Sequence, residues 1–304
     1  MNNKIKYATI LALATAIISG FNSFLAKIAV TAVKDPVVFT SLKNGIVGLF
    51  LIGAIIAWKK WPEIKNLNRK QWLMLVAIGI VGGFIPFALF FTGLAHASAV
   101  NASLIHKTLF LWVFIFAIPF LKEKITWPQW IGVGLIFLAN LMVGGFNGFK
   151  FSGAELMILG ATIFWAVENI IAKKALASIS TLTVVSARMV IGSLLLFGLV
   201  GWQGNIGIIA RMSGTQWLWT LIPAVLLTGY VLTWYKALSL APATYVATLL
   251  VPATLITNAL SAIFVTHSLS GQNIMGGALY IAGAIIVIYF YGRNTSLHPV
   301  RFRA

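Results

Sequence analysis

The sequence predicts an all-α membrane protein with about ten transmembrane helices, arranged as two five-helix repeats of inverted topology. Sixty per cent of the 304 residues are apolar and 9% are charged, whereas soluble domains carry about 25% charged residues. The apolar residues also fall into runs long enough to cross a bilayer core, which takes about 20 residues of helix. Similarity between the two halves of the chain then predicts the arrangement.

Ten apolar runs, bounded by charges or by clusters of Pro, Gly and Asn, define the spans. They cover residues 7–30, 36–58, 71–94, 97–120, 127–145, 152–174, 181–202, 215–238, 243–266 and 271–291. The first run lacks a clear small-residue cleavage site, which favours a helix over a signal peptide. Only the connections 59–70 and 203–214 exceed a few residues, so sequential helices should be antiparallel neighbours.

The excess of 22 Lys and Arg over five Asp and Glu would suggest nucleic-acid binding in a soluble protein. Here the basic residues lie in short clusters between apolar runs, which is the orientation signal of a membrane protein. With the amino terminus inside, fifteen of them are cytoplasmic, and Lys34, Lys150 and Arg211 lie on the other side. We therefore predict a multi-pass protein of the cytoplasmic membrane, with both termini cytoplasmic and with lipid, not nucleic acid, around it.

The two halves match at an offset of about 144 to 146 residues. The matching positions include Lys27 with Lys173, Lys43 with Arg188, Leu94 with Leu238, Ala97 with Ala241, and Gln129 with Gln272. We place the repeats at residues 1–147 and 148–304, the second ending in a short basic tail that is predicted to be cytoplasmic. Five helices per repeat would give the second repeat the opposite orientation, and inverted repeats typically hold a substrate site at the midplane and alternate its access.

Motifs in both halves resemble those of a known family. The first half contains FLKEKIT at residues 120–126, followed by Gln129 and Gly132, and the second contains YKAL at 235–238 and a PA pair at 242–243. These stretches resemble EamA domains, and the chain resembles a drug/metabolite transporter with two tandem copies. The resemblance implies five plus five helices and export or exchange of amino acids, metabolites or drugs. Two positions depart from it: Thr108 replaces the usual mid-helix proline, and His267 stands where the second copy would carry its glutamate.

Three basic residues lie deep inside predicted spans, where a charge costs roughly 2.5 to 3.5 kcal/mol. Lys107 is about 15 Å deep, so it either pairs structurally with a carboxylate or carbonyls, or takes part in substrate binding or coupling. The preceding His106 is predicted to be a packing residue. Lys43 and Arg188 occupy equivalent repeat positions and either line a cavity or extend to the headgroups.

Glu168 is the only acidic residue well inside a span, and Trp165 shares its helical face. A carboxylate at that depth either forms a structural ion pair with a buried base, Lys107 or Arg188, or exchanges protons during transport. The repeat places Asn22 opposite or beside it.

Three aromatic residues lie deeper than the interfacial anchors of the chain: Trp165, Tyr230 and Trp234. They either bound a substrate pocket or pack against lipid and other helices.

Together these residues predict a secondary transporter that exports or exchanges a small anionic or zwitterionic solute, foremost an amino acid or a related carboxylate. No Walker A pattern is present, so energy would come from ion or solute gradients, with proton coupling through Glu168 as one route. A permease for phosphorylated, nucleotide-like or lipid-linked substrates is the alternative, because a basic pathway suits them too. A membrane-embedded enzyme is a remote alternative, and we predict no enzymatic activity, cofactor or metal. The sequence leaves the oligomeric state open.

Overall fold

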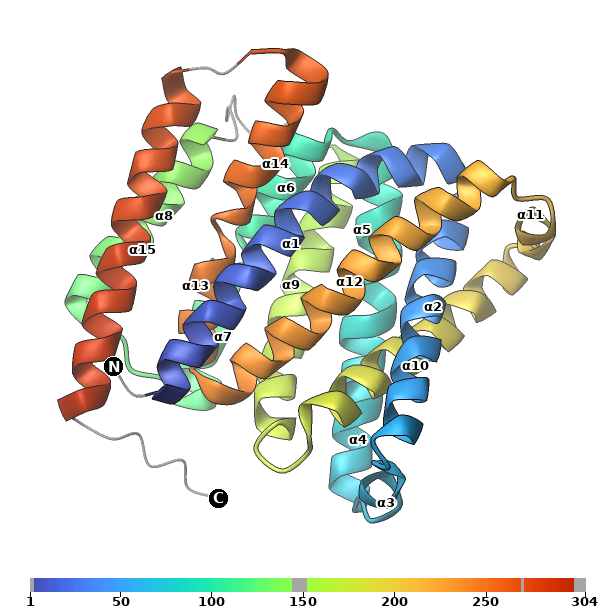
Figure 1. Ribbon diagram of the computed structural model, residues 1–304, viewed down its shortest axis with the longest axis horizontal. Coiled ribbons are helices and arrows are strands. Elements are labelled where there is room, and N and C mark those ends of the chain that lie inside the picture. Colours follow the sequence, from blue (N-terminus) through green and yellow to red (C-terminus); the bar gives the residue numbers. More distant parts are fainter. Residues whose placement is uncertain (1–2, 144–151, 269–270, 298–304) are drawn as a thin grey trace.

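The computed structural model describes residues 3–143, 152–268 and 271–297, and its regular elements in these ranges are helices (Figure 1). They are α1 (Asn3–Val33), α2 (Pro36–Ala57), α3 (Trp61–Lys65), α4 (Arg69–Ile78), the π-helical η1 (Gly79–Phe84), α5 (Ile85–His96), α6 (Ala99–Lys107), α7 (Leu109–Leu121), α8 (Trp127–Val143), α9 (Gly153–Ala175), α10 (Thr181–Trp202), α11 (Ile206–Ala210), α12 (Gly214–Leu240), α13 (Ala243–Leu250), α14 (Ala253–Ser261), the π-helical η2 (Ala262–Thr266) and α15 (Gly271–Leu297).

Within the described ranges, nine helical segments are long and apolar enough to cross a membrane, and the 17-residue α8 is a shorter apolar helix. Large apolar side chains such as Leu49, Phe50 and Trp202 are exposed on the outer surface of the bundle, where lipid must cover them. The all-α membrane class is therefore confirmed, and its surroundings are a lipid bilayer. The predicted repeat boundary between residues 147 and 148 lies outside the described residues.

Two spans are interrupted at equivalent positions. Thr108 separates α6 from α7, and Val251 and Pro252 separate α13 from α14. The first interruption exists without a proline, and there Thr108 Oγ1 donates a hydrogen bond of 2.6 Å to the carbonyl of Ile105. Thr108 therefore stands at the position that Pro252 occupies in the second half, and the span is interrupted at both. Interrupted helices inside the membrane are typical of transporters, whose solute sites they border.

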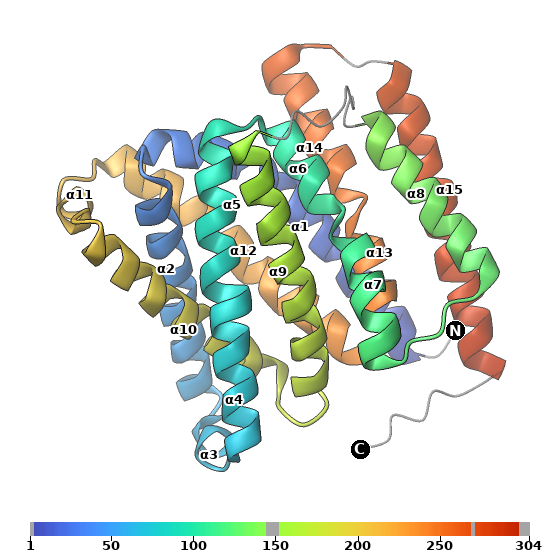
Figure 2. The same cartoon turned by 180° about the vertical axis from the view of Figure 1, so that it is seen from behind.

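Helix packing repeats between the two halves (Figures 1 and 2). α1 packs along α12, as α9 packs along the α4–α5 span, and α1 also contacts the α13–α14 span as α9 contacts α6 and α7. α2 packs on its counterpart α10, and α8 packs on its counterpart α15, at one side of the bundle in both views. Each of these contacts has a counterpart in the other half, so the helices are arranged with approximate twofold symmetry.

Hydrogen bonds at the helix ends follow the same symmetry. Lys27 Nζ donates to the carbonyls of Leu94 and Ala97, each at 2.7 Å, at the carboxyl end of α5. At the carboxyl end of α12, Lys173 Nζ donates to the carbonyls of Leu238 at 2.6 Å and Ala241 at 2.8 Å. An ammonium is stabilised at the negative end of a helix, and these lysines were among the residues that revealed the repeat.

Further bonds join one half to the other at both ends of the molecule. At one end, the carboxylate of Glu63 accepts from the backbone N–H (2.7 Å) and hydroxyl (2.8 Å) of Ser180, which caps α10. At the other end, Asp35, which caps α2, accepts a 2.7 Å bond from the Asn205 amide. Each bond ties a long connection of one half to the start of the second span of the other.

One contact between the halves departs from the symmetry. Glu123 accepts from the N–H groups of Ala243 (2.7 Å) and Thr244 (3.0 Å) and from the Thr244 hydroxyl (2.6 Å), and so caps α13, which has no cap of its own. Lys122 and His267 both adopt left-handed conformations, with φ of 56° and 51°. When Lys122 is matched with His267, the counterpart of Glu123 is the exposed Ser268, not His267 as the sequence predicts. Neither residue carries a carboxylate.

A glycine pair predicts a strong effect on stability. A Cβ on Gly192 in α10 would lie 2.6 Å from Gly83 Cα in η1, closer than real Cβ atoms come. We expect Gly192→Ala to lower the free energy of unfolding by roughly 1 to 3 kcal/mol, because packed helices cannot separate without losing contacts. Gly198→Ala is the control on the same helix, since its Cβ would meet nothing within 4 Å. Thermal unfolding in detergent measures both; equal melting temperatures would contradict this expectation.

Candidate functional site

A small cavity of about 60 Å³ lies between the two halves, lined by both polar and apolar side chains. That volume holds on the order of four water molecules, so a larger solute enters only if the lining side chains or helices move. The lining residues are Ser19, Asn22, Ser23, Ala26, Lys43, Phe87, Phe90, Phe91, His106, Leu109, Trp165, Glu168, Asn169, Arg188, Leu227, Tyr230, Trp234 and Tyr235. They come from spans of both halves, beside the interruption between α6 and α7.

The structure brings seven of the eight predicted site residues into the wall of this cavity: Asn22, Lys43, Trp165, Glu168, Arg188, Tyr230 and Trp234. Lys43 and Arg188 are 0% and 4% exposed, so they belong to the cavity wall and do not extend to the headgroups. Lys107 is not among the lining residues. Its Nζ donates a 2.7 Å hydrogen bond to the hydroxyl of Ser19, which is part of the wall.

Glu168 is the acidic centre of the cavity. Its Oε1 accepts a short hydrogen bond from the Tyr235 hydroxyl, and Arg188 Cζ lies 5.7 Å from the centroid of the Tyr235 ring. Glu168 and Arg188 also meet at Gly82 in η1, where a Cβ would lie 2.8 Å from Glu168 Cδ and 3.2 Å from Arg188 Nε. The predicted alternative of an ion pair between Glu168 and Lys107 does not fit this geometry, because Lys107 Nζ donates its hydrogen bond to Ser19.

Gly82 in η1 leaves room for Glu168 and Arg188 because it has no side chain. Trp165 Nε1 donates a 3.0 Å hydrogen bond to the Gly82 carbonyl, which fixes the indole beside Glu168 on α9. π-helical turns leave the regular hydrogen-bond ladder and are frequent at functional sites.

Lys43 lies in a different environment from its repeat counterpart Arg188. Its Nζ has no hydrogen-bond partner among the described residues. Three phenyl rings lie around it, with centroids 3.7 Å (Phe91), 5.1 Å (Phe87) and 5.3 Å (Phe39) away. Ring faces attract a cation, but they do not replace an anion.

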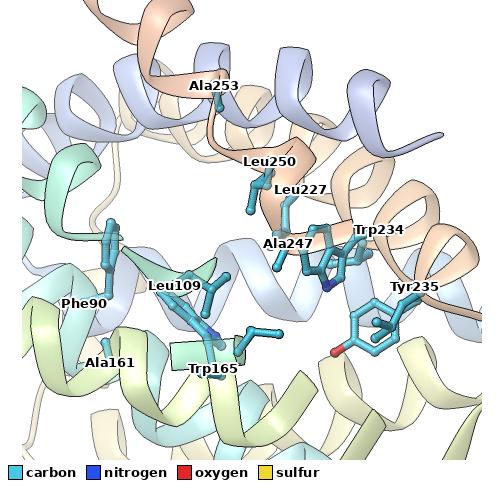
Figure 3. Packing of buried hydrophobic residues seen from close by; sticks show 14 of the residues in the cluster. Phe90, Leu109, Ala161, Trp165, Leu227, Trp234, Tyr235, Ala247, Leu250 and Ala253 are labelled. Carbon is cyan, nitrogen blue, oxygen red and sulfur yellow. The ribbon is translucent and has the colours of Figure 1, made fainter. Parts of the chain in front are cut away.

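Aromatic rings form two groups on the cavity wall. Trp165 contacts Phe87 and Phe90, each with centroids 5.4 Å apart, and His106 at 4.9 Å. On α12, Tyr230 and Trp234 stack with centroids 6.1 Å apart and planes inclined by 10°. In Figure 3, Trp234 and Tyr235 lie to the right of Phe90 and Trp165, which come from two other helices. His106 packs as predicted, and it also lines the cavity.

Several residues that line the cavity are not predicted as site residues from the sequence. Tyr235 belongs to the YKAL motif, but nothing in the motif says that its hydroxyl reaches Glu168. Asn169 accepts a 2.9 Å bond from Trp234 Nε1, and its position next to Glu168 was the available signal. Neither Phe87 nor Ser19 carries any such signal, because apolar and hydroxyl residues are common in all spans.

The cavity therefore offers two buried cations, one carboxylic acid, several neutral donors and two aromatic surfaces. These groups suit binding of a small charged organic solute. Among the described residues there is no group of three or more His, Cys, Asp or Glu side chains placed to hold a metal ion.

Two similar halves around a central cavity with buried charges are typical of membrane transporters. The fold and the cavity therefore define a multi-pass membrane transporter. The chain belongs to the EamA-like transporter family, whose profile matches residues 6–145 and again residues 152–289. The two matches confirm the tandem-domain resemblance found in the motifs.

Curated relatives are transporters by name. The chain is 31% identical over 135 residues to the uncharacterized transporter YyaM of Bacillus subtilis (strain 168), a match covering 42% of this chain and 44% of the relative. It therefore spans less than half the length of that relative. An uncharacterized transporter of Archaeoglobus fulgidus is 22% identical over 277 residues, covering 86% and 94% of the two chains. A solved structure with 18% sequence identity aligns over 94% of this chain and 97% of its own, with a TM-score of 0.74, and so shows the same fold.

Proposed function

We propose that this transporter exports or exchanges small organic solutes, foremost amino acids and related carboxylates, by alternating access to the central cavity. The observation that carries the proposal is the cavity itself: Lys43, Arg188 and Glu168 are buried together there, from both repeats. Buried charges inside a membrane are costly and mark solute or proton pathways. Binding and movement of the solute, without chemical change, account for the site, so the proposal includes no enzymatic reaction.

Alternating access would follow from the symmetry of the repeats. Five spans in each half invert the second half with respect to the first, so the two halves would present equivalent surfaces to opposite sides of the membrane. Rocking one half against the other would expose the cavity to each side in turn. A gradient of protons or of a second solute would supply the energy, with Glu168 as the proton-exchanging group.

Transport by the purified protein tests the proposal. The chain is reconstituted in liposomes and pooled radiolabelled amino acids and other organic acids are screened for counterflow, with and without a pH gradient. Counterflow above that of empty liposomes supports the proposal. Absence of counterflow for amino acids and carboxylates, with transport of phosphorylated metabolites instead, would favour the alternative substrate class that basic residues also suit.

Orientation in the membrane is a separate prediction. The asymmetry of basic residues predicts that both termini, and the end that carries Glu63 and Glu123, lie in the cytoplasm. A reporter protein that is active only in the cytoplasm should therefore be active when it is fused to either terminus. A reporter that is active only outside the cytoplasm would reverse the assignment.

A further inference from the structure

Lys43 is a buried basic side chain whose amino group has no polar partner among the described residues. The side chain is 0% exposed, and its Nζ has no hydrogen-bond partner in the described part of the chain. Its closest surroundings are the rings of Phe91, Phe87 and Phe39. A buried ammonium without an anion is costly, so a ligand that brings an anion to Lys43 would stabilise its charged form.

Arg188, the repeat counterpart of Lys43, also has a buried Nε without a hydrogen-bond partner among the described residues, but it has an acid beside it. It meets Glu168 at Gly82, and Tyr235 touches both, through its hydroxyl bond to Glu168 and its ring beside the guanidinium. One acid therefore stands next to one of the two cations. The remaining positive charge belongs to Lys43.

The ring of Phe87 connects the two cations. Its centroid lies 5.1 Å from Lys43 Nζ and 5.2 Å from Arg188 Cζ. The ring also contacts Trp165 edge-on at 5.4 Å. A solute whose anionic group reaches Lys43 therefore places its body against an aromatic surface.

Resting on the proposed function, we infer that the solute is a small monocarboxylate with an apolar body, whose carboxylate binds Lys43. The single unneutralised cation accepts one negative charge. A dicarboxylate or a phosphate dianion would bring a second negative charge close to Glu168, which already stands beside Arg188. Asn22 Oδ1, buried in the same cavity without a partner, provides an acceptor for an amino or hydroxyl group on the solute.

Matched probes separate the charge of the solute from its shape. Binding to the purified protein is measured by tryptophan fluorescence with benzoate against benzamide, L-phenylalanine against L-phenylalaninamide, and phthalate as the dianion. We expect each carboxylate to bind roughly tenfold or more tightly than its amide, since an unpaired buried charge penalises the neutral ligand. Phthalate should bind more weakly than benzoate. Lys43→Met should abolish the preference over the amides, and Lys43→Arg should retain part of it.

Equal binding of carboxylates and amides, or no binding of any carboxylate probe at millimolar concentration, would overturn the inference. A preference that survives Lys43→Met would assign the anion to another residue. Melting without ligand gives a second readout: Lys43→Met should hold or raise the melting temperature, because it removes an unpaired charge, whereas a structural role predicts a decrease. Counterflow of a neutral or cationic solute that is unaffected by Lys43→Met would reject this inference and leave the transporter proposal intact.

Discussion

We expect Glu168→Gln to lower the rate of pH-gradient-driven transport on the order of tenfold or more, with little change in stability. Glutamine keeps the shape of the side chain and an oxygen that can accept the Tyr235 hydroxyl bond, but it exchanges no proton. A carboxylic acid buried in a cavity beside Arg188 is placed to take up and release a proton as its exposure alternates. Flux into liposomes at several imposed pH gradients, together with melting in detergent, measures both effects.

Glu155→Gln is the matched control. Glu155 is also buried, at 8% exposure, and lies on the same helix, but it bonds Asn101 at 3.3 Å and does not line the cavity. Its glutamine variant should transport at the wild-type rate. If Glu168→Gln also transports at that rate with unchanged pH dependence, Glu168 is not the coupling residue.

Lys107→Gln distinguishes the cavity wall from the layer behind it. Lys107 is 1% exposed and bonds Ser19 rather than the cavity directly. Loss of its charge should therefore change the melting temperature more than the pH dependence of transport. The reverse result would place Lys107 in the coupling pathway together with Glu168.

The helices were predictable from the sequence because lipid imposes one rule on every span. A run of about 20 apolar residues must be a helix in a bilayer, and the observed ends differ from the predicted ones by a few residues. The interruption at Thr108 was not predictable, since threonine does not break a helix by itself.

The cavity was predictable in its charged members and not in its neutral ones. Lys43, Glu168 and Arg188 are so costly in a membrane that their presence alone indicates a site. The choice between cavity and headgroups for Lys43 required the structure, because depth along a helix does not fix the direction of a side chain. The roles of Tyr235 and Phe87 depend on contacts between helices that are far apart in the sequence.

The contacts at the two ends of the molecule are symmetric except at Glu123, and this difference has a consequence for transport. At both ends of the molecule a lysine holds the turn between the third and fourth spans of one repeat, and polar bonds join the halves through Ser180 and Asp35. The three bonds of Glu123 to α13 are present at the predicted cytoplasmic end, where α13 has no other side-chain cap. At the other end, α6 is capped within its own half by Ser98.

These contacts predict that the cytoplasmic end is the more firmly closed one. Under alternating access, opening that end separates the halves and breaks the three bonds of Glu123. At the opposite end, no carboxylate among the described residues caps α6 in this way, because Ser98 of the same half is its cap. Loss of a helix cap costs about 0.5 to 2 kcal/mol, and 1 or 2 kcal/mol changes a two-state population by a factor of roughly 5 to 30.

We therefore expect Glu123→Gln to increase access to the cavity from the cytoplasmic side several-fold. The chain has no cysteine, so Ser23→Cys places a single thiol in the cavity wall for a membrane-impermeant reagent applied to either side. In the Ser23→Cys protein, the reagent should label the thiol faster from outside than from the cytoplasmic side. Adding Glu123→Gln should raise the labelling rate from the cytoplasmic side and lower the rate from outside. Thr244→Val removes one of the three bonds and should give a smaller change in the same direction, whereas Lys124→Gln, which changes a neighbouring exposed charge, should give none. Equal labelling rates from both sides in all four proteins would show that Glu123 does not bias the opening of the transporter.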